Sequence, residues 1–202
     1  MSTPTFLKAA PESAKPEKVD IRFPFRLKPR MTLKKALRHL KTKKITQCDF
    51  SDNGTGLTSL KCSIDGLIAH KTFVPNAVVL EFQKDRLVNV TLLKEGIPNC
   101  VSMVKDYGSA LDFMTERYHL DSPQTVNRPP SDSSQCGSYV DRLITWLGAD
   151  RTMPGPESNY FWDGKTPDYL ALTGVYREDK GYRVYLRFTH VPSFQGRSSP
   201  HG

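Results

Sequence analysis

Four cysteines constrain what this chain of 202 residues can fold into more than any other feature. Cys48 and Cys62 flank a segment rich in turn-forming residues, Ser51 to Leu57. The residues on either side, 45–50 and 58–64, predict the two arms of a β-hairpin. A turn centred near Thr55 brings Cys48 opposite Cys62. Directly opposed residues on antiparallel strands have Cβ atoms about 4.5–5.5 Å apart, and a close pair of this kind can be joined by a disulfide. We therefore predict a disulfide on the buried face of this hairpin, together with the opposed pairs Thr46–Ile64 and Phe50–Leu60.

The other two cysteines, Cys100 and Cys136, flank a predicted helix and predict a second disulfide that closes a long loop. Since the chain has neither a Cys-x-x-Cys motif nor a Cys/His cluster with zinc spacing, we expect no metal and no cofactor. Four reduced, buried cysteines in a cytosolic protein are the alternative.

Hydrophobic periodicity predicts two main helices. The first covers 31–40, with Thr32 as its cap and with an apolar stripe of Leu33, Ala36, Leu37 and Leu40. The second covers 102–118, with Ser102 as its cap and an apolar stripe of Met103, Tyr107, Ala110, Leu111, Met114 and Tyr118. A further short helix is expected at 139–147.

Alternating residues predict more strands. Residues 21–27 predict an edge strand that Pro24 limits, and hairpins are expected at 71–82 with 87–93 and at 169–177 with 182–191. Uneven alternation after residue 87 predicts a bulge or burial on both faces. In the last strand Tyr182, Val184, Leu186 and Phe188 are expected to face inward, and Arg183, Tyr185 and Arg187 outward. The predicted fold class is α+β: an antiparallel sheet built from hairpins, with two main helices packed on one face.

Composition suggests a flexible leader at 1–20, an α+β domain at 21–191 and a disordered tail at 192–202. The domain could consist of two subunits, 21–96 and 97–191. No apolar run is long enough for a transmembrane segment, and the N-terminus lacks the apolar core of a signal peptide. Disulfides nevertheless predict export, so we expect a periplasmic or secreted protein whose signal was removed; a cytoplasmic location is the alternative.

The formal net charge is +8, and much of the excess lies between residues 21 and 44, where no acidic residue occurs. This basic block comprises Arg22, Arg26, Lys28, Arg30, Lys34, Lys35, Arg38, Lys41, Lys43 and Lys44. Such a block attracts anions, and a solvated face without a dedicated partner is the alternative. We predict that the block forms a binding surface together with the aromatic residues Tyr160 and Trp162.

No catalytic motif is apparent, so we predict a protein that is not an enzyme. The segment Asp49 to Gly54 superficially has the form of a calcium loop, but Leu60 stands where a bidentate glutamate is needed. None of the five histidines lies in a nucleophile or metal motif, and paired cysteines leave no free thiol for nucleophilic catalysis.

Several segments resemble small bacterial envelope proteins of the SmpA/OmlA-like and β-lactamase-inhibitor-protein-like type. The segment 26–37 is similar to their Gly-Met-Thr motif, with Arg30 in place of the usual glycine. The segment 79–90 resembles their hairpin, with Asp85 where glycine is common. The segment 111–119 is similar to a closing helix, and Trp162-Asp-Gly to a following strand. The resemblance implies a non-enzymatic scaffold that binds another macromolecule.

We therefore expect an exported binding protein of the bacterial envelope, acting through protein–protein contact as an inhibitor, an immunity protein or a subunit of an envelope complex. The expected partner is a protein with an acidic surface, or else an anionic envelope component. Two alternatives remain: a cytosolic basic protein that binds nucleic acid, and an enzyme that acts on an anionic cell-wall polymer.

Overall fold

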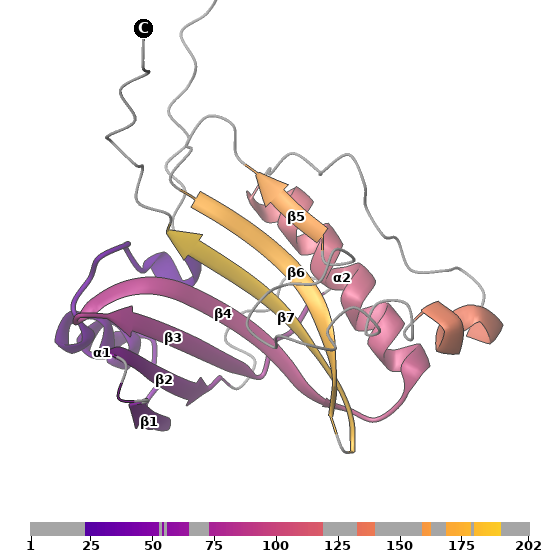
Figure 1. The fold of residues 1–202 in the computed structure, drawn as a ribbon, viewed down its shortest axis with the longest axis horizontal. Helices are drawn as coiled ribbons and strands as arrows, with labels where there is room; N and C mark the ends of the chain where they lie inside the picture. The colour runs from indigo at the N-terminus through magenta and orange to yellow at the C-terminus, as the bar shows by residue number, and fades with distance from the viewer. Residues whose placement is uncertain are drawn as a thin grey trace, which may run out of the picture.

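A computed structural model describes residues 23–52, 54, 56–64, 73–118, 133–139, 159–162, 169–178 and 180–190. The fold is α+β, with one antiparallel sheet of seven strands in the order β1-β2-β3-β4-β7-β6-β5 (Figure 1). The strands are β1 (Cys48–Asp52), β2 (Leu57–Ser63), β3 (Ala77–Gln83), β4 (Arg86–Ile97), β5 (Asn159–Trp162), β6 (Tyr169–Glu178) and β7 (Gly181–His190). The predicted leader 1–20 and tail 192–202 lie outside the described residues, as does most of the helix expected at 139–147.

The cysteine hairpin has the predicted register. Cys48 lies opposite Cys62 and Phe50 opposite Leu60, and Cys48 and Cys62 form a disulfide. Leu60 and Cys62 are buried, as expected, but Phe50 is 58% exposed. The expectation for Phe50 was wrong because β1 is the edge strand of the sheet, where strand alternation alone does not ensure cover.

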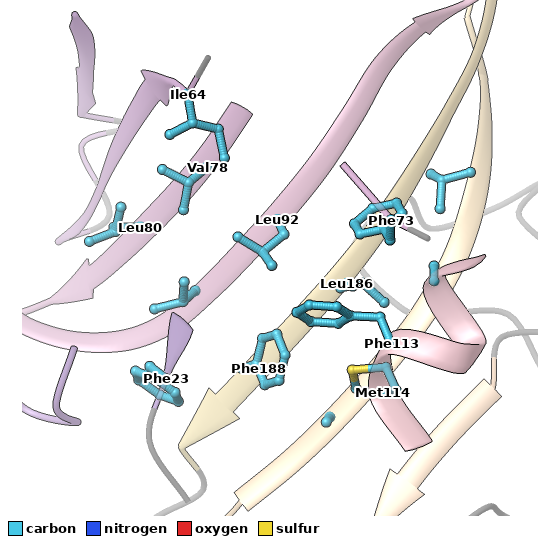
Figure 2. Packing of buried hydrophobic residues seen from close by; sticks show 14 of the residues in the cluster. Phe23, Ile64, Phe73, Val78, Leu80, Leu92, Phe113, Met114, Leu186 and Phe188 are labelled. Carbon is cyan, nitrogen blue, oxygen red and sulfur yellow. The ribbon is translucent and has the colours of Figure 1, made fainter. Parts of the chain in front are cut away.

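Two helices, α1 (Leu33–Thr42) and α2 (Cys100–Tyr118), contribute to one main core on one face of the sheet. Figure 2 shows Val78, Leu80, Leu92, Leu186 and Phe188 of the sheet in this cluster, with Phe113 and Met114 of α2. The packing confirms the predicted α+β class with two helices on one face. Among the described residues, none of the helices is both long and apolar enough to cross a membrane.

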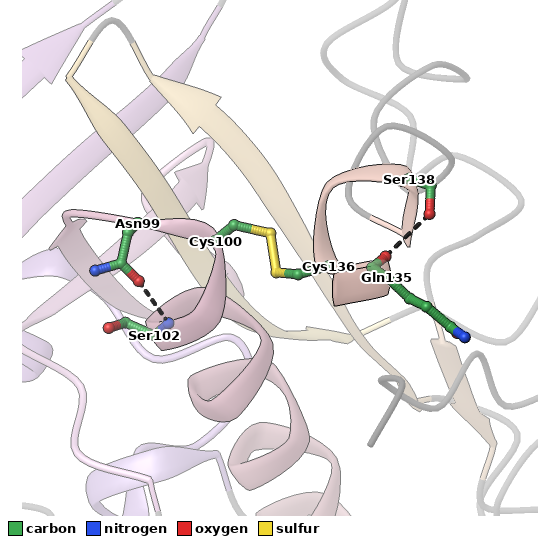
Figure 3. Close-up of a disulfide and its surroundings, with 6 residues drawn as sticks. All are labelled: Asn99, Cys100, Ser102, Gln135, Cys136 and Ser138. Atoms are coloured by element: carbon green, nitrogen blue, oxygen red, sulfur yellow. Dashed lines mark hydrogen bonds between the residues drawn. A yellow bond between two sulfur atoms is a disulfide. The ribbon is translucent and has the colours of Figure 1, made fainter. Parts of the chain in front are cut away.

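Helix α2 begins at the second disulfide, which joins Cys100 to Cys136 (Figure 3). Cys136 follows a short 3₁₀ helix, η2 (Ser133–Gln135). The helix cap is Asn99, whose Oδ1 accepts a hydrogen bond from the backbone N–H of Ser102 at 2.9 Å. The prediction of Ser102 as the cap was wrong because α2 starts earlier than the apolar stripe indicates.

The opposite face of the sheet carries a smaller apolar cluster of Ala77, Leu93, Leu172 and Tyr185. Tyr185 was expected to face solvent, yet it is only 3% exposed and stacks on Tyr176 with ring centroids 4.9 Å apart. Gly174 lies opposite Tyr185, and a Cβ there would approach carbons of the Tyr185 ring to 2.7 Å. The tyrosine ring therefore occupies the space that a side chain at position 174 would need.

The second hairpin contains the expected bulge, between Glu81 and Phe82 of β3 and their partners in β4. Its two-residue turn, Lys84 and Asp85, has positive φ values of 49° and 58°. Both residues therefore adopt a left-handed backbone, which is the geometry of the tight turns that join antiparallel strands.

The edge strand predicted at 21–27 is wrong. Residues Pro24–Arg26 form a 3₁₀ helix, η1, in which Phe25 and Arg26 have φ values of 61°. The backbone oxygen of Phe25 lies 2.8 Å from Nε2 of His39 on α1. Because Phe23 and Leu27 are buried on either side of η1, this segment packs as an anchored turn and not as a strand.

Candidate functional site: a basic surface

The start of α1 is held by two side chains, one local and one distant. Thr32 Oγ1 accepts from the N–H of Lys35 at 3.4 Å, as predicted for a cap. Asp85 Oδ1 accepts from the N–H of Leu33 at 3.0 Å, across 52 residues of sequence. Because the first turn of α1 contains no acidic residue, the carboxylate of Asp85 supplies the negative charge that a helix N-terminus favours.

The segment before α1 is joined to β4 by backbone hydrogen bonds. The N–H of Arg30 donates to the oxygen of Leu87, and the N–H of Leu87 donates to the oxygen of Met31, both at 2.9 Å. The guanidinium of Arg86 also donates to the oxygen of Arg30 at 3.3 Å. The basic segment is therefore attached to the β3–β4 hairpin near its turn.

Every described member of the basic block is exposed to solvent. These residues are Arg26, Lys28, Arg30, Lys34, Lys35, Arg38, Lys41, Lys43 and Lys44, whereas Arg22 lies outside the described residues. Within the part of the chain that the structure describes, none of them pairs with a carboxylate; the ion pairs there involve Lys61, Arg183 and Arg187. The positive charge of the block is consequently available at the surface.

An apolar side chain lies among these cations. Leu37 was predicted to join the buried stripe of α1, but it is 40% exposed, while Ala36 and Leu40 are buried. Lys34 and Lys41 are its neighbours on the helix surface, since residues three and four apart lie side by side. The stripe prediction was wrong at Leu37 because the buried face of this helix is narrower than its apolar pattern.

Tyr160 and Trp162, the aromatic residues expected to complete the surface, belong to β5. Strand β5 is the edge strand at the end of the sheet opposite to β1, and Figure 1 shows α1 near β1, β2 and β3, away from β5. The structure therefore does not bring these two residues together with the exposed cations of α1.

Two further cations, Lys84 and Arg86, lie beside the basic block because the β3–β4 turn places them there, and the sequence pattern did not indicate this. With Arg30 they line a half-open cavity of about 570 Å³. Asn89, Thr189 and His190 also line it. The hairpin was predicted from its pattern, but its contact with Arg30 depends on tertiary packing.

Asn89, at the wall of this cavity, is buried. Its Nδ2 donates to Oε2 of Glu81 at 2.7 Å, and Arg187 pairs with the same carboxylate oxygen at 2.6 Å. The carboxylate requires a donor, so this contact determines the orientation of the Asn89 amide. Its Oδ1 is buried and has no hydrogen-bond partner among the described residues.

The described residues offer little for acid–base or metal chemistry. Burial raises the pKa of Asp106 on α2, and Lys94 and Lys105 partly oppose this rise. The described residues hold no group of three or more His, Cys, Asp or Glu side chains that could bind a metal. The arrangement that stands out is thus a cationic surface.

Comparisons with protein-family models, with curated proteins and with solved structures found no match to this chain. The resemblance to small bacterial envelope proteins therefore stays a prediction from sequence motifs.

Proposed function

We propose that this protein is an exported binding protein of the bacterial envelope that recognises an acidic surface of a partner protein. The observation that carries the proposal is the exposed, unpaired basic surface of α1 and the segment before it. An inhibitor, an immunity protein or a subunit of an envelope complex would act in this way, by occlusion or scaffolding and without chemistry of its own.

The exposed Leu37 supports a protein partner over a simple polyanion. Charged rims mainly accelerate and orient encounter, whereas buried apolar and aromatic contacts carry most of the affinity. Lys34 and Lys41 flank Leu37 on α1, so an apolar contact would be surrounded by positive charge. A partner surface with an apolar pocket and an acidic rim would complement both features.

The two disulfides support the proposed export, because such bonds persist in oxidising compartments and are rare in the cytosol. Thiol labelling of the natively expressed protein, followed by intact-mass measurement with and without reduction, tests this part. We expect no label before reduction and four labels after it. Labelling of all four cysteines in the native sample would contradict an exported, oxidised protein.

The binding surface is tested by matched charge reversals. A partner is first captured from the envelope fraction of the native host with wild-type protein and identified by mass spectrometry. We then compare Lys34→Glu/Lys41→Glu with Lys105→Glu/Lys180→Glu, which changes the net charge equally at exposed positions on α2 and on the β6–β7 turn. The first variant should slow association by about tenfold or more, since electrostatic steering spans that range.

The control variant should associate within about twofold of the wild-type rate, and raising the salt concentration should reduce the difference between variants. Equal rates for both variants would refute the assignment of the surface to α1. A Leu37→Ser variant should mainly accelerate dissociation, because a lost apolar contact acts after encounter. If a nucleic acid binds instead, with affinity that falls steeply with salt, the nucleic-acid alternative replaces this proposal.

A further inference from the structure

The cavity beside the β3–β4 turn differs from the α1 surface in shape and in composition. Its volume of about 570 Å³ falls within the range of ligand pockets, about 300–1,000 Å³. Cationic and polar side chains from three separate segments line it: Arg30 before α1, Lys84, Arg86 and Asn89 of the hairpin, and His190 at the end of β7. The cavity is open to solvent, and its three cations are exposed.

The cations of the cavity make no direct ion pair. Arg30, Lys84 and Arg86 form none with a carboxylate in the part of the chain that the structure describes. Glu81 is occupied by Arg187 and Asn89, and Asp85, which keeps its negative charge, accepts from the N–H of Leu33 at the start of α1. Three cations against the one carboxylate of Asp85 leave the site with a net positive charge.

The backbone positions of two of these cations are fixed. Arg30 adopts a left-handed φ of 62°, and its N–H donates to the oxygen of Leu87, which holds it against β4. Lys84 has a φ of 49° because it belongs to the tight turn between β3 and β4. Both side chains line the same cavity.

We propose that this cavity binds the phosphate or carboxylate group of a small polar ligand. Arginine guanidinium groups match the geometry of such oxyanions through paired N–H donors, and a lysine adds a point charge. Among the described residues, Arg86 makes one side-chain hydrogen bond, the 3.3 Å bond to the oxygen of Arg30.

Calorimetric titration of the full, disulfide-bonded chain with pyrophosphate and with citrate tests this proposal. Chloride keeps the ionic strength near 0.15 M, where exposed charges more than about 8 Å apart are largely screened. We expect saturable binding of one molecule per chain by at least one probe. Tighter binding of pyrophosphate would indicate that the natural ligand contains a phosphate group. Tighter binding of citrate would indicate that it contains a carboxylate group.

Arg86→Ala and Lys84→Ala should each weaken binding by about tenfold or more, as loss of a charge-assisted hydrogen bond does. Lys105→Ala and Lys180→Ala are matched controls, because they remove exposed cations that belong neither to the cavity nor to the basic block; they should change affinity by less than twofold. Circular dichroism checks folding, and Arg86→Gln replaces Arg86→Ala if that variant unfolds.

Two outcomes would overturn the proposal. One is the absence of saturable binding with both probes, and the other is an equal loss of affinity in the cavity variants and the control variants. The inference does not depend on the proposed protein partner. Reversal of Lys34 and Lys41 tests the α1 surface, whereas the loss of Lys84 or Arg86 tests the cavity.

Discussion

Replacing Arg30 by glycine should stabilise this protein, whereas the same replacement at Arg38 should destabilise it. Both arginines are exposed members of the basic block, so either change removes one positive charge and little packing. They differ in their backbone. Arg30 has a left-handed φ of 62°, and Arg38 lies within the helix α1.

The magnitudes follow from these conformations. A residue with a Cβ in the left-handed region costs about 1–2 kcal/mol relative to the right-handed region, and glycine avoids this cost. Glycine also makes the unfolded chain more flexible, which offsets about 0.4–1 kcal/mol. The expected net gain for Arg30→Gly is about 0.8 kcal/mol from the midpoints of these ranges, whose limits give about 0–1.6 kcal/mol. In a helix interior glycine is about 0.8–1.0 kcal/mol less favourable than alanine, so Arg38→Gly should lose slightly less than that.

Thermal and urea unfolding followed by circular dichroism, with both disulfides intact, measure these effects. For a chain of this size, 1 kcal/mol corresponds to about 2–4 °C in Tm. Arg30→Ala is the decisive control, because alanine removes the charge but keeps the Cβ, and it should not reproduce the gain. If Arg30→Gly destabilises as much as Arg38→Gly does, strain at Arg30 is not the controlling factor. If Arg30→Ala gains as much as glycine, relief of charge repulsion explains the effect.

Three further predictions concern other elements. Asn99→Ala should reduce the free energy of unfolding by about 1 kcal/mol through loss of the α2 cap, whereas Ser102→Ala should leave it nearly unchanged in the same urea assay. Asp106→Asn should raise Tm at pH 7. Burial raises the pKa of the Asp106 carboxyl in the folded state above its ordinary value of 3.8. The contribution of this carboxyl to stability is therefore fully present below pH 3.8 and is lost as the pH rises through the folded pKa. Melting curves at pH 3 should show no gain for this variant, and a gain that persists there would contradict the assignment to ionisation. Gly174→Ala should cost about 1–3 kcal/mol through collision with the Tyr185 ring, and a double-mutant cycle with Tyr185→Leu should recover part of this loss; strictly additive effects would exclude the collision.

Local patterns determined much of the fold. The turn-forming residues between Cys48 and Cys62 set the register of the first hairpin, and their disulfide is present as predicted. The later hairpins were likewise predicted from alternation, which follows the period of two that every strand obeys. The second disulfide, whose cysteines are 36 residues apart, was predicted from the even number of cysteines.

The wrong predictions concern how elements are covered. Tyr185 alternates like an outward residue, but the opposite face of the sheet also buries an apolar cluster, so alternation did not indicate exposure. Leu37 and Phe50 are apolar in sequence yet exposed, because the neighbouring elements do not extend over them. Residues 23–27 have a strand-like pattern, but Phe23 and Leu27 are buried around a 3₁₀ turn that contacts His39.

The two candidate sites also differ in whether the sequence alone reveals them. The basic block is visible in the sequence because ten cations occur in 24 consecutive residues, 21–44, without an acidic one. The cavity is not visible there, because Arg30, Arg86 and His190 are far apart in the chain and meet only when β4 pairs with β7 and with the segment before α1. Similarly, Asp85 caps α1 across 52 residues. The sequence alone thus determined the elements, the cysteine pairs and the sign of the surface charge, whereas long-range strand pairing decided which charges converge and which side chains are buried.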